Sequence, residues 1–281
     1  AKKLGIPVIG TNHFLPDNLT PFFHLPNRVD KLIHKLAWLH FRHIFHKLDF
    51  ATTPTKSAGD ILKTIGFKKE VRPISNGIDL KIFNPQNNGD YLKKKYSISN
   101  KKILLYVGRL DKEKNIDWII RALAIVLKKT DIHFVVVGGG SQGKNLKKLA
   151  KSVGVEKSVT FTGFMQDRDL PNIYAIADCF AIAGTAELQS LFAMEAMASG
   201  LPIIAANARA LPELVSDGEN GYLFEPGNIQ EIADAIVNLF GNPDLQKRMR
   251  KKSLELIRKH EINKAIGEFE KIYQSLQKKA N

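Results

Sequence analysis

The order of sequence patterns along this 281-residue chain predicts an α/β protein whose parallel strands belong to two domains. Short apolar runs suited to buried strands alternate with longer segments in which apolar residues repeat about every 3.6 positions. Glycine, asparagine or proline ends many of these segments, as at Gly200 to Pro202 and at Asn242-Pro243. Because parallel strands need a long crossover connection, usually a helix, this alternation favours parallel sheets.

The chain opens in the middle of a motif. Ala1 to Leu4 suit the end of a helix, Gly5 its terminating glycine, and Pro7 to Gly10 the next strand. We therefore expect residues 1–95 to hold only the remnant of an N-terminal domain and the linker after it. Residues 96–260 should form a second domain, and residues 261–281 a C-terminal helix.

The composition indicates a cytoplasmic protein without a disulfide framework. The single cysteine, Cys179, lies in an apolar run, as is usual in a reducing compartment. No group of His, Cys and Asp residues has metal-ligand spacing, and no apolar run is long enough to span a bilayer. We expect no metal and no other cofactor.

Two glutamates lie around the start of a predicted helix in residues 187–203. Glu187 follows an apolar strand, and Glu195 lies about a turn into the helix that ends at Gly200. The first carboxylate should therefore lie at the carboxyl end of a strand, where open α/β sheets bind ligands. Carboxylates accept hydrogen bonds, so the pair suits a ligand rich in hydroxyl groups. The alternative is two solvated glutamates on a helix surface.

A second strand, loop and helix occupies residues 104–123. The apolar strand ends at Gly108, Arg109 and Lys114 follow in the loop, and Asn115 is placed to cap the next helix. A glycine lets a ligand approach the backbone, and two cations beside a helix N-terminus suit a diphosphate. The alternative is that both cations are simply solvated.

A run of glycines at positions 138–140 follows the next predicted strand. We interpret it as a structural turn between strand and helix and not as a dinucleotide-binding fingerprint, because the following strand, residues 159–164, supplies no acidic residue. Gly163, at the end of that strand, is expected to let the backbone approach a nucleobase.

Taken together, these motifs resemble retaining glycosyltransferases with the GT-B fold, of the glycosyltransferase group 1 or family 4 type. The resemblance rests on Arg109 and Lys114 at the helix start and on the glutamate pair followed by Ala-Met-Ala-Ser-Gly-Leu-Pro. It implies a complete C-terminal Rossmann-like domain that binds a nucleotide-sugar, preceded by the end of an N-terminally truncated, Rossmann-like acceptor domain. The C-terminal helix would cross back to that first domain.

The resemblance also implies roles for the residues that bind the donor nucleotide. Arg109 and Lys114 would hold the diphosphate beside Gly108 and offset the charge that develops as the diphosphate leaves. Glu195 would accept hydrogen bonds from the ribose hydroxyls. The donor is expected to be a UDP-sugar rather than a GDP-sugar.

The sugar itself would be held by residues of both domains. Glu187 would orient it, the backbone amides of Leu191 and Phe192 would add donors, and His13 would close the site from the N-terminal domain. The family's commonest pattern after the first glutamate is Ser-Phe-Gly, whereas this chain has Leu188-Gln189-Ser190. A glutamine there is familiar from members that act on lipids, so the acceptor is expected to be a lipid or a glycan.

The net charge of +14 indicates an anionic partner. Basic, apolar and aromatic residues mix within residues 27–50, which suits a helix lying on an anionic membrane surface. An ordinary helix packed on the N-terminal sheet is the alternative. Nucleic acid is not expected as a partner, because no nucleic-acid-binding motif accompanies the charge.

Two other functions compete with a hexosyltransferase that retains the anomeric configuration. One is a nucleotide-sugar-binding module without turnover, and the other is a basic scaffold associated with membranes. Neither accounts for Arg109, Lys114, Glu187 and Glu195 together.

Overall fold

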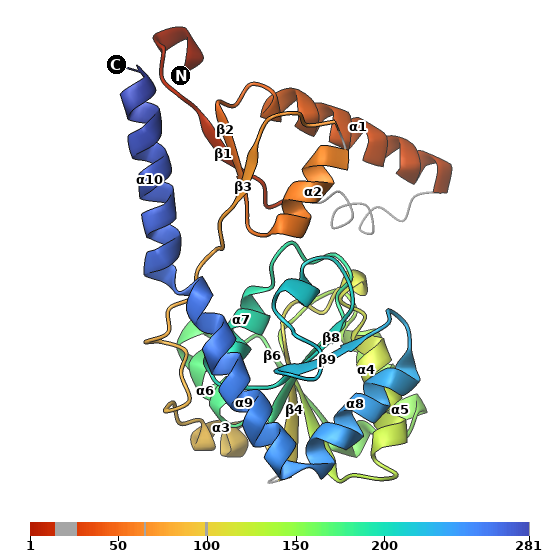
Figure 1. Cartoon of the computed structure of the whole chain (residues 1–281). Coiled ribbons are helices and arrows are strands. Elements are labelled where there is room, and N and C mark those ends of the chain that lie inside the picture. The colour runs from red at the N-terminus through yellow and green to blue at the C-terminus, as the bar shows by residue number, and fades with distance from the viewer. Residues whose placement is uncertain (15–26, 65, 99–100, 281) are drawn as a thin grey trace. The chain divides into compact units, whose positions relative to one another are not determined.

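The computed structural model describes residues 1–14, 27–64, 66–98 and 101–280, and they fold as two compact units. Unit 1 consists of Ala1–Gly77, Ala186–Gln189 and His260–Asn281, and unit 2 of Ile78–Thr185 and Ser190–Lys259. Each unit has a parallel sheet and helices (Figure 1), as the sequence predicted.

Unit 1 is built on a three-stranded parallel sheet with the strand order β1-β2-β3. Its elements are η1 (Lys2–Leu4), β1 (Ile9–Thr11), α1 (Asn27–Phe45), β2 (Phe50–Thr53), α2 (Lys56–Thr64), β3 (Val71–Pro73) and α10 (Ile262–Ala280). Phe45 of α1 packs with Leu62 of α2, while Ile272 of α10 packs with Ile74. The C-terminal helix is therefore part of the core of unit 1.

Unit 2 is built on a six-stranded parallel sheet with the order β6-β5-β4-β7-β8-β9. In chain order this is 3-2-1-4-5-6, the order of a doubly wound sheet. The strands are β4 (Lys102–Val107), β5 (Ile132–Val137), β6 (Val159–Gly163), β7 (Cys179–Ile182), β8 (Ile203–Ala206) and β9 (Gly221–Phe224).

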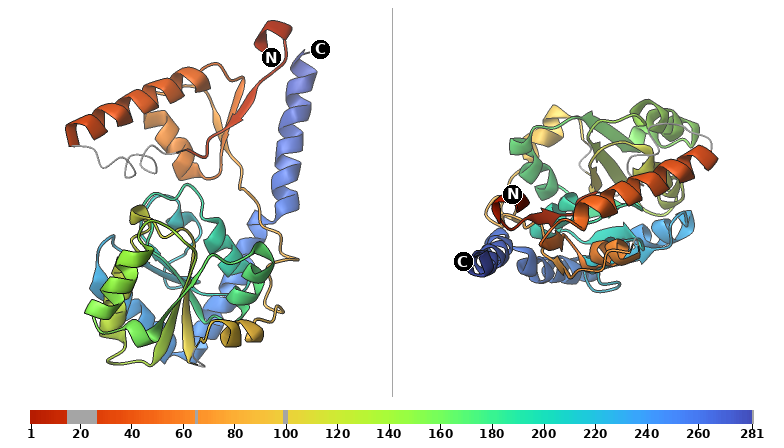
Figure 2. Two further views of the ribbon diagram at one scale, coloured as in Figure 1. Left: turned by 180° about the vertical axis from the view of Figure 1, so that it is seen from behind. Right: turned by 90° about the horizontal axis from the view of Figure 1, so that it is seen from above.

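Helices cover both faces of this sheet, as Figures 1 and 2 show. The neighbouring helices α4, α5 and α8 pack together, and α7 packs with α6 and α9. Strands β5, β7 and β8 are buried throughout, as a sheet covered on both faces requires. The helices are α3 (Asp90–Lys95), α4 (Ile116–Val126), α5 (Gly143–Ser152), α6 (Leu170–Ala175), α7 (Leu191–Ala198), α8 (Ile229–Gly241) and α9 (Pro243–Ile257).

Unit 2 begins at Ile78, whereas the sequence pattern assigned residues 1–95 to the N-terminal remnant and its linker and began the second domain at residue 96. The residues in between belong to unit 2 because Ile78, Leu92 and Ile98 are buried in its core. The sequence did not reveal which core the buried Leu92 of α3 joins.

The glycine run after β5 is a structural turn. Gly138 has φ +128°, and a Cβ atom there would lie 1.9 Å from the carbonyl oxygen of Gly108. A Cβ atom on Gly140 would lie 2.6 Å from the backbone of Leu110. Only glycine permits these approaches, so the loops that follow β4 and β5 pack backbone to backbone.

Candidate functional site

The candidate site begins at the point in unit 2 where the strand order reverses. Strands β4 and β7 are neighbours, but the chain continues from them to opposite edges of the sheet. Ligands of doubly wound sheets bind outside the carboxyl ends of the strands at such a switch point. The loop after β4 carries Arg109 and Lys114, and the loop after β7 carries Glu187.

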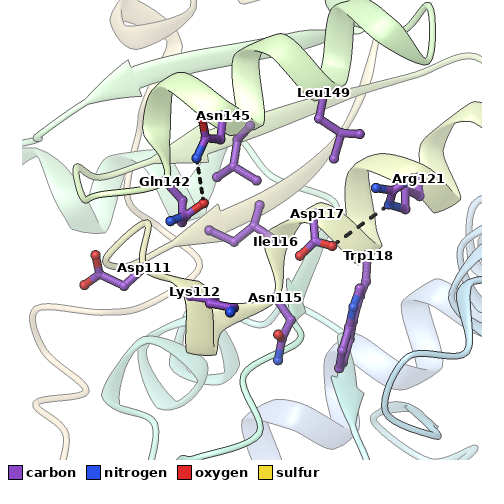
Figure 3. A pocket seen from close by; sticks show the side chains of 11 residues that line it. Asp111, Lys112, Asn115, Ile116, Asp117, Trp118, Arg121, Gln142, Asn145 and Leu149 are labelled. Atoms are coloured by element: carbon purple, nitrogen blue, oxygen red, sulfur yellow. Dashed lines mark hydrogen bonds and ion pairs between the residues drawn. The ribbon is translucent and has the colours of Figure 1, made fainter. Parts of the chain in front are cut away.

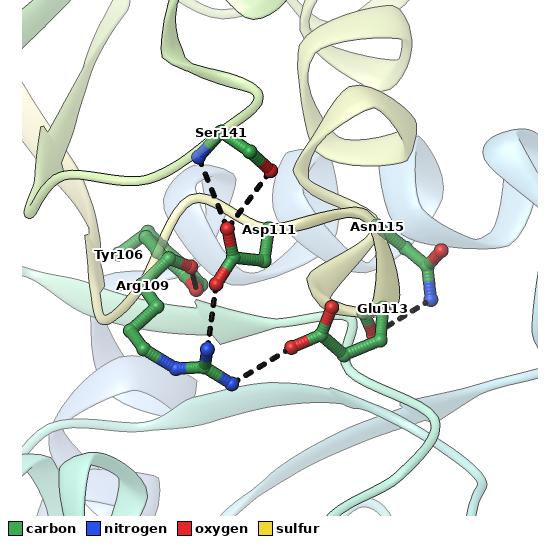
Figure 4. Close-up of polar contacts among 6 residues, drawn as sticks. All are labelled: Tyr106, Arg109, Asp111, Glu113, Asn115 and Ser141. Carbon is green, nitrogen blue, oxygen red and sulfur yellow. Dashed lines mark hydrogen bonds and ion pairs between the residues drawn. The ribbon is translucent and has the colours of Figure 1, made fainter. Parts of the chain in front are cut away.

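The guanidinium of Arg109 is held by two carboxylates of its own loop (Figure 4). It donates to Asp111 Oδ2 at 2.7 Å and to Glu113 Oε1 at 2.9 Å. Asp111 Oδ1 in turn accepts from the backbone nitrogen of Ser141 at 3.0 Å and from its hydroxyl at 2.9 Å. The Tyr106 hydroxyl donates to the Arg109 carbonyl at 2.8 Å. The arginine is thus oriented before any ligand arrives, while 54% of its side chain remains exposed.

The rest of this loop joins the two central strands. Lys114 ends the short 3-10 helix η4 (Lys112–Lys114), and Asn115 follows it at φ +49°. Asn115 precedes α4 as predicted, but its side chain does not cap that helix. Instead, its amide donates to the carbonyl of Ala183 at 3.1 Å, just after β7. Asn115 therefore occupies the N-cap position as predicted, but its side chain bonds to the neighbouring strand end and not to the first turn of α4.

A cavity of about 370 Å³ opens above the carboxyl ends of β4 and β5. Its walls include the predicted residues Gly108, Arg109 and Phe192. Phe164, which is 80% exposed, also lines it. The complete lining is Val107, Gly108, Arg109, Val137, Gly138, Gly139, Phe164, Met165, Asp167, Leu170 and Phe192. An apolar and aromatic space with a guanidinium at its edge suits a flat, partly apolar ligand that carries an anionic group.

Glu195 lies on α7 and is largely enclosed by protein. Its Oε2 accepts a hydrogen bond of 2.7 Å from the hydroxyl of Tyr174, which is completely buried. Burial raises the pKa of Glu195 from 4.5 to about 7, the Tyr174 hydrogen bond opposes this, and the nearby charge of Asp167 adds to it. A ligand hydroxyl that donates a hydrogen bond to the ionised carboxylate would stabilise that form and lower the pKa of Glu195.

The start of α7 presents backbone donors beside the cavity. Ser190 caps the helix, because its hydroxyl accepts from the nitrogen of Ala193 at 3.3 Å. The first amides of a helix have no carbonyl partner within it, and they belong here to Leu191 and Phe192. Phe192 also contributes its side chain to the cavity, a role that the sequence did not predict.

Glu187 lies in the short segment Ala186–Gln189, which belongs to unit 1 although unit 2 continues the chain on both sides. The Thr55 hydroxyl donates to the carbonyl of Leu188 at 2.7 Å. Gln189 Oε1 accepts from the backbone nitrogen of Asn76 at 2.8 Å, and its Nε2 donates to the Ser75 hydroxyl at 3.1 Å. The unusual glutamine at this position therefore anchors the glutamate loop to the segment after β3.

The predicted site residues thus fall into two groups. Gly108, Arg109, Lys114, Gly163, Leu191, Phe192 and Glu195 lie in unit 2, whereas His13 and Glu187 lie in unit 1. The sequence motifs did not point to Phe164, Asp167 or Tyr174. An aromatic residue directly after a strand-ending glycine was the available signal for Phe164, whereas nothing local marked Tyr174 as the partner of Glu195.

The fold and site define a two-unit Rossmann-like α/β protein with a ligand cavity at the switch point. The sequence profile described as "Glycosyl transferases group 1" matches residues 89–255, and the one described as "Glycosyltransferase Family 4" matches residues 1–82. The chain therefore belongs to the group 1 glycosyltransferases. This confirms the family that the sequence motifs suggested.

The alpha-monoglucosyldiacylglycerol synthase of Streptococcus pneumoniae is 32% identical in an alignment that covers 96% of this chain and 62% of that protein. The chain thus spans less than two thirds of this relative. The structure of Anabaena Alr3699/HepE in complex with UDP-glucose has a TM-score of 0.83 at 21% identity, over 96% of this chain and 72% of that one. The C-terminal domain of LpcC from Francisella tularensis is 31% identical, with a TM-score of 0.59, over 66% of this chain and all of that one. The fold is of the GT-B type.

Two features are absent from the residues that the structure describes. No group of three or more His, Cys, Asp or Glu side chains in this part of the chain has an arrangement that could hold a metal ion. None of the helices over the same residues combines the length and apolar character that crossing a membrane requires.

Proposed function

We propose that this chain carries the donor half of a retaining hexosyltransferase that uses a UDP-sugar and a lipid or glycan acceptor. The observation that carries the proposal is the cavity above β4 and β5, which combines Gly108, Arg109 and Phe192 at the switch point of the sheet. A nucleoside diphosphate has the matching parts, a flat base and an anionic tail. The UDP-glucose in the Anabaena structure favours uridine as the base.

The base would enter the cavity and stack on an aromatic wall that includes Phe164. The diphosphate would then extend toward Arg109 and Lys114. Asp111 and Glu113 hold the guanidinium in place, so little side-chain entropy remains to be lost when the diphosphate binds. Gly163, with φ +74°, is the last residue of β6 and directly precedes Phe164.

The ribose would reach Glu195, which accepts one hydrogen bond from Tyr174 and has a second carboxylate oxygen for a ribose hydroxyl. Glu187, His13 and the first amides of α7 would orient the hexose. In the reaction, the bond from the anomeric carbon to the diphosphate breaks and a bond to the acceptor oxygen forms on the same face. The acceptor proton passes to the departing diphosphate, whose charge Arg109, Lys114 and the α7 N-terminus offset.

A calorimetric titration tests the donor site. UDP and GDP are each added to the folded chain, to Arg109→Ala and to Arg248→Ala, which removes the same charge from the exposed side of α9. UDP should bind in the micromolar range. Arg109→Ala should weaken binding by about 1.5–3 kcal/mol, the usual size of a charge-assisted hydrogen bond, and Arg248→Ala should not. Absence of UDP binding to folded protein would contradict the donor site, while GDP binding alone would correct the base.

We also propose that α1 contacts an anionic membrane, on the observation that one of its apolar faces is not covered within unit 1. Trp38, Phe41 and Phe45 pack inward, whereas Leu32 is 56% exposed and Leu36 is 55% exposed. Further apolar and basic residues on the exposed side of α1 and just after it are Val29, Lys31, Lys35, Leu39, Arg42 and Lys47. Apolar side chains next to lysines match an anionic bilayer surface. The synthase name of the pneumococcal relative is consistent with a lipid acceptor.

Co-sedimentation with vesicles tests this contact. The chain should bind phosphatidylglycerol vesicles, bind pure phosphatidylcholine vesicles weakly, and lose binding as salt rises. Replacing Leu32 and Leu36 with serine should reduce binding at least tenfold. The matched control is Ile266→Ser, on the exposed side of α10. If the leucine variant binds as well as the unchanged chain, α1 is not the contact surface.

A further inference from the structure

A second cavity lies in unit 2, separate from the proposed nucleotide site and lined by different residues. It has a volume of about 470 Å³ and opens between the first turns of α4 and α5 (Figure 3). This volume falls within the range of roughly 300–1,000 Å³ that is usual for small-molecule sites. The proposed transferase mechanism gives the cavity no role.

Charges in the cavity cancel. Its lining includes two acidic side chains, Asp111 and Asp117, and two basic ones, Lys112 and Arg121. Asp111 is already bound to Arg109 and Ser141, and Asp117 pairs with Arg121 at 4.0 Å. A highly charged ligand such as a diphosphate would therefore find no net attraction here.

Planar amides line the side of the cavity next to the loops. Gln142 and Asn145 form this side, and Asn145 Nδ2 donates to Gln142 Oε1 at 3.1 Å. Asn115 also lines the cavity, but its amide donates to the carbonyl of Ala183. Every amide offers both N–H donors and a carbonyl acceptor. Hydroxyl groups also donate and accept, so a ligand with several hydroxyls matches this wall without carrying charge.

Apolar side chains form the rest of the lining. Trp118 is half-buried, Ile116 and Leu146 are buried, and Leu149 packs against the core of unit 2. Figure 3 shows Trp118 across the cavity from Gln142 and Asn145. An indole ring beside aliphatic carbons can pack against a ligand surface made of C–H groups. The tryptophan side chain has only two rotatable bonds, so it loses little conformational entropy when a ligand binds.

We propose that this cavity binds an uncharged saccharide. A sugar ring has an apolar face of C–H groups and a rim of hydroxyls, which correspond to the Trp118 side and to the amide side of the cavity. The bond between Asp111 and Ser141 links the loop after β4 to the start of α5, so it holds the two sides at a constant separation. The proposal does not depend on the donor site, because the lining residues differ and no nucleotide is involved.

The two tryptophans of the chain allow a direct test, since Trp38 lies in unit 1 and Trp118 in unit 2. In the Trp38→Phe protein, the tryptophan emission comes from Trp118 alone. Titration with maltotriose or methyl α-D-glucopyranoside, without nucleotide, should give a saturable change in the millimolar range. Glycerol at the same osmolality should not. Circular dichroism verifies that each variant is folded.

Variants at the start of α5 then assign the site. The double variant Gln142→Ala with Asn145→Ala should weaken saccharide binding about tenfold, because it removes the hydrogen bonds of the amide wall. Lys148→Ala, on the exposed side of the same helix, is the matched control and should bind normally. The proposal is overturned if neither saccharide gives a saturable signal, if the double variant binds normally, or if only inorganic phosphate or AMP saturates the signal.

Discussion

Replacing Glu195 with glutamine should stabilise unit 2 at neutral and alkaline pH but not in acid. The substitution keeps the shape of the side chain and an oxygen that accepts from Tyr174, while it removes a carboxylate that burial disfavours when ionised. Because the pKa of Glu195 rises from 4.5 to about 7 on folding, the folded state holds its proton more tightly than the unfolded state. The unchanged protein therefore loses stability as the pH rises from 4.5 to about 7.

The magnitude follows from this shift. One pKa unit corresponds to about 1.4 kcal/mol, so the rise from 4.5 to about 7 is on the order of 3 kcal/mol. At pH 5 part of this loss has occurred, and at pH 8 nearly all of it has. The advantage of Glu195→Gln over the unchanged protein should therefore grow by about 2–3 kcal/mol between the two conditions.

Urea unfolding at pH 5 and pH 8 measures the difference, with Trp118 emission in a Trp38→Phe background as the probe of unit 2. Glu156→Gln, which removes an exposed carboxylate beside β6, controls for the change in net charge. If Glu195→Gln gives the same difference in unfolding free energy at both pH values, burial does not hold the proton on Glu195. UDP binding, measured on the same two proteins, should tighten as the pH rises through 7. The increase in affinity should be larger for the unchanged protein than for Glu195→Gln, because the ribose is expected to bind the carboxylate form of Glu195.

Three further outcomes are expected. Gly138→Ala should destabilise unit 2 by about 2–5 kcal/mol in urea unfolding. Its new Cβ atom would clash with the Gly108 carbonyl oxygen, and alanine rarely adopts the φ angle of this position. An effect below about 1 kcal/mol would show that the two loops do not pack this closely. Gln189→Ala should destabilise unit 1 by about 1–3 kcal/mol, followed through Trp38, because the nitrogen of Asn76 loses its acceptor, and unit 2 should be unaffected. EDTA should leave UDP binding unchanged, since Arg109 and Lys114 are proposed to replace a metal ion; a Kd that rises with chelator would contradict that role.

Local patterns in the sequence were sufficient for most of unit 2. An apolar run that ends in glycine predicted β4 and the loop after it, and helical periodicity after Asn115 predicted α4. Such patterns report burial and backbone conformation, which depend mainly on near neighbours in the chain. The same patterns misplaced the unit boundary, because a buried residue such as Leu92 has the same pattern whichever core it joins.

The sequence by itself determined the fold class, the family and the order of the site residues along the chain, because these depend on residue type and spacing. Only the tertiary structure decided which residues meet. It joined Tyr174 to Glu195, placed Phe164 with Arg109 in one cavity and assigned the Glu187 segment to unit 1. Contacts of this kind connect residues far apart in the chain, and the raised pKa of Glu195 follows from its enclosure by them.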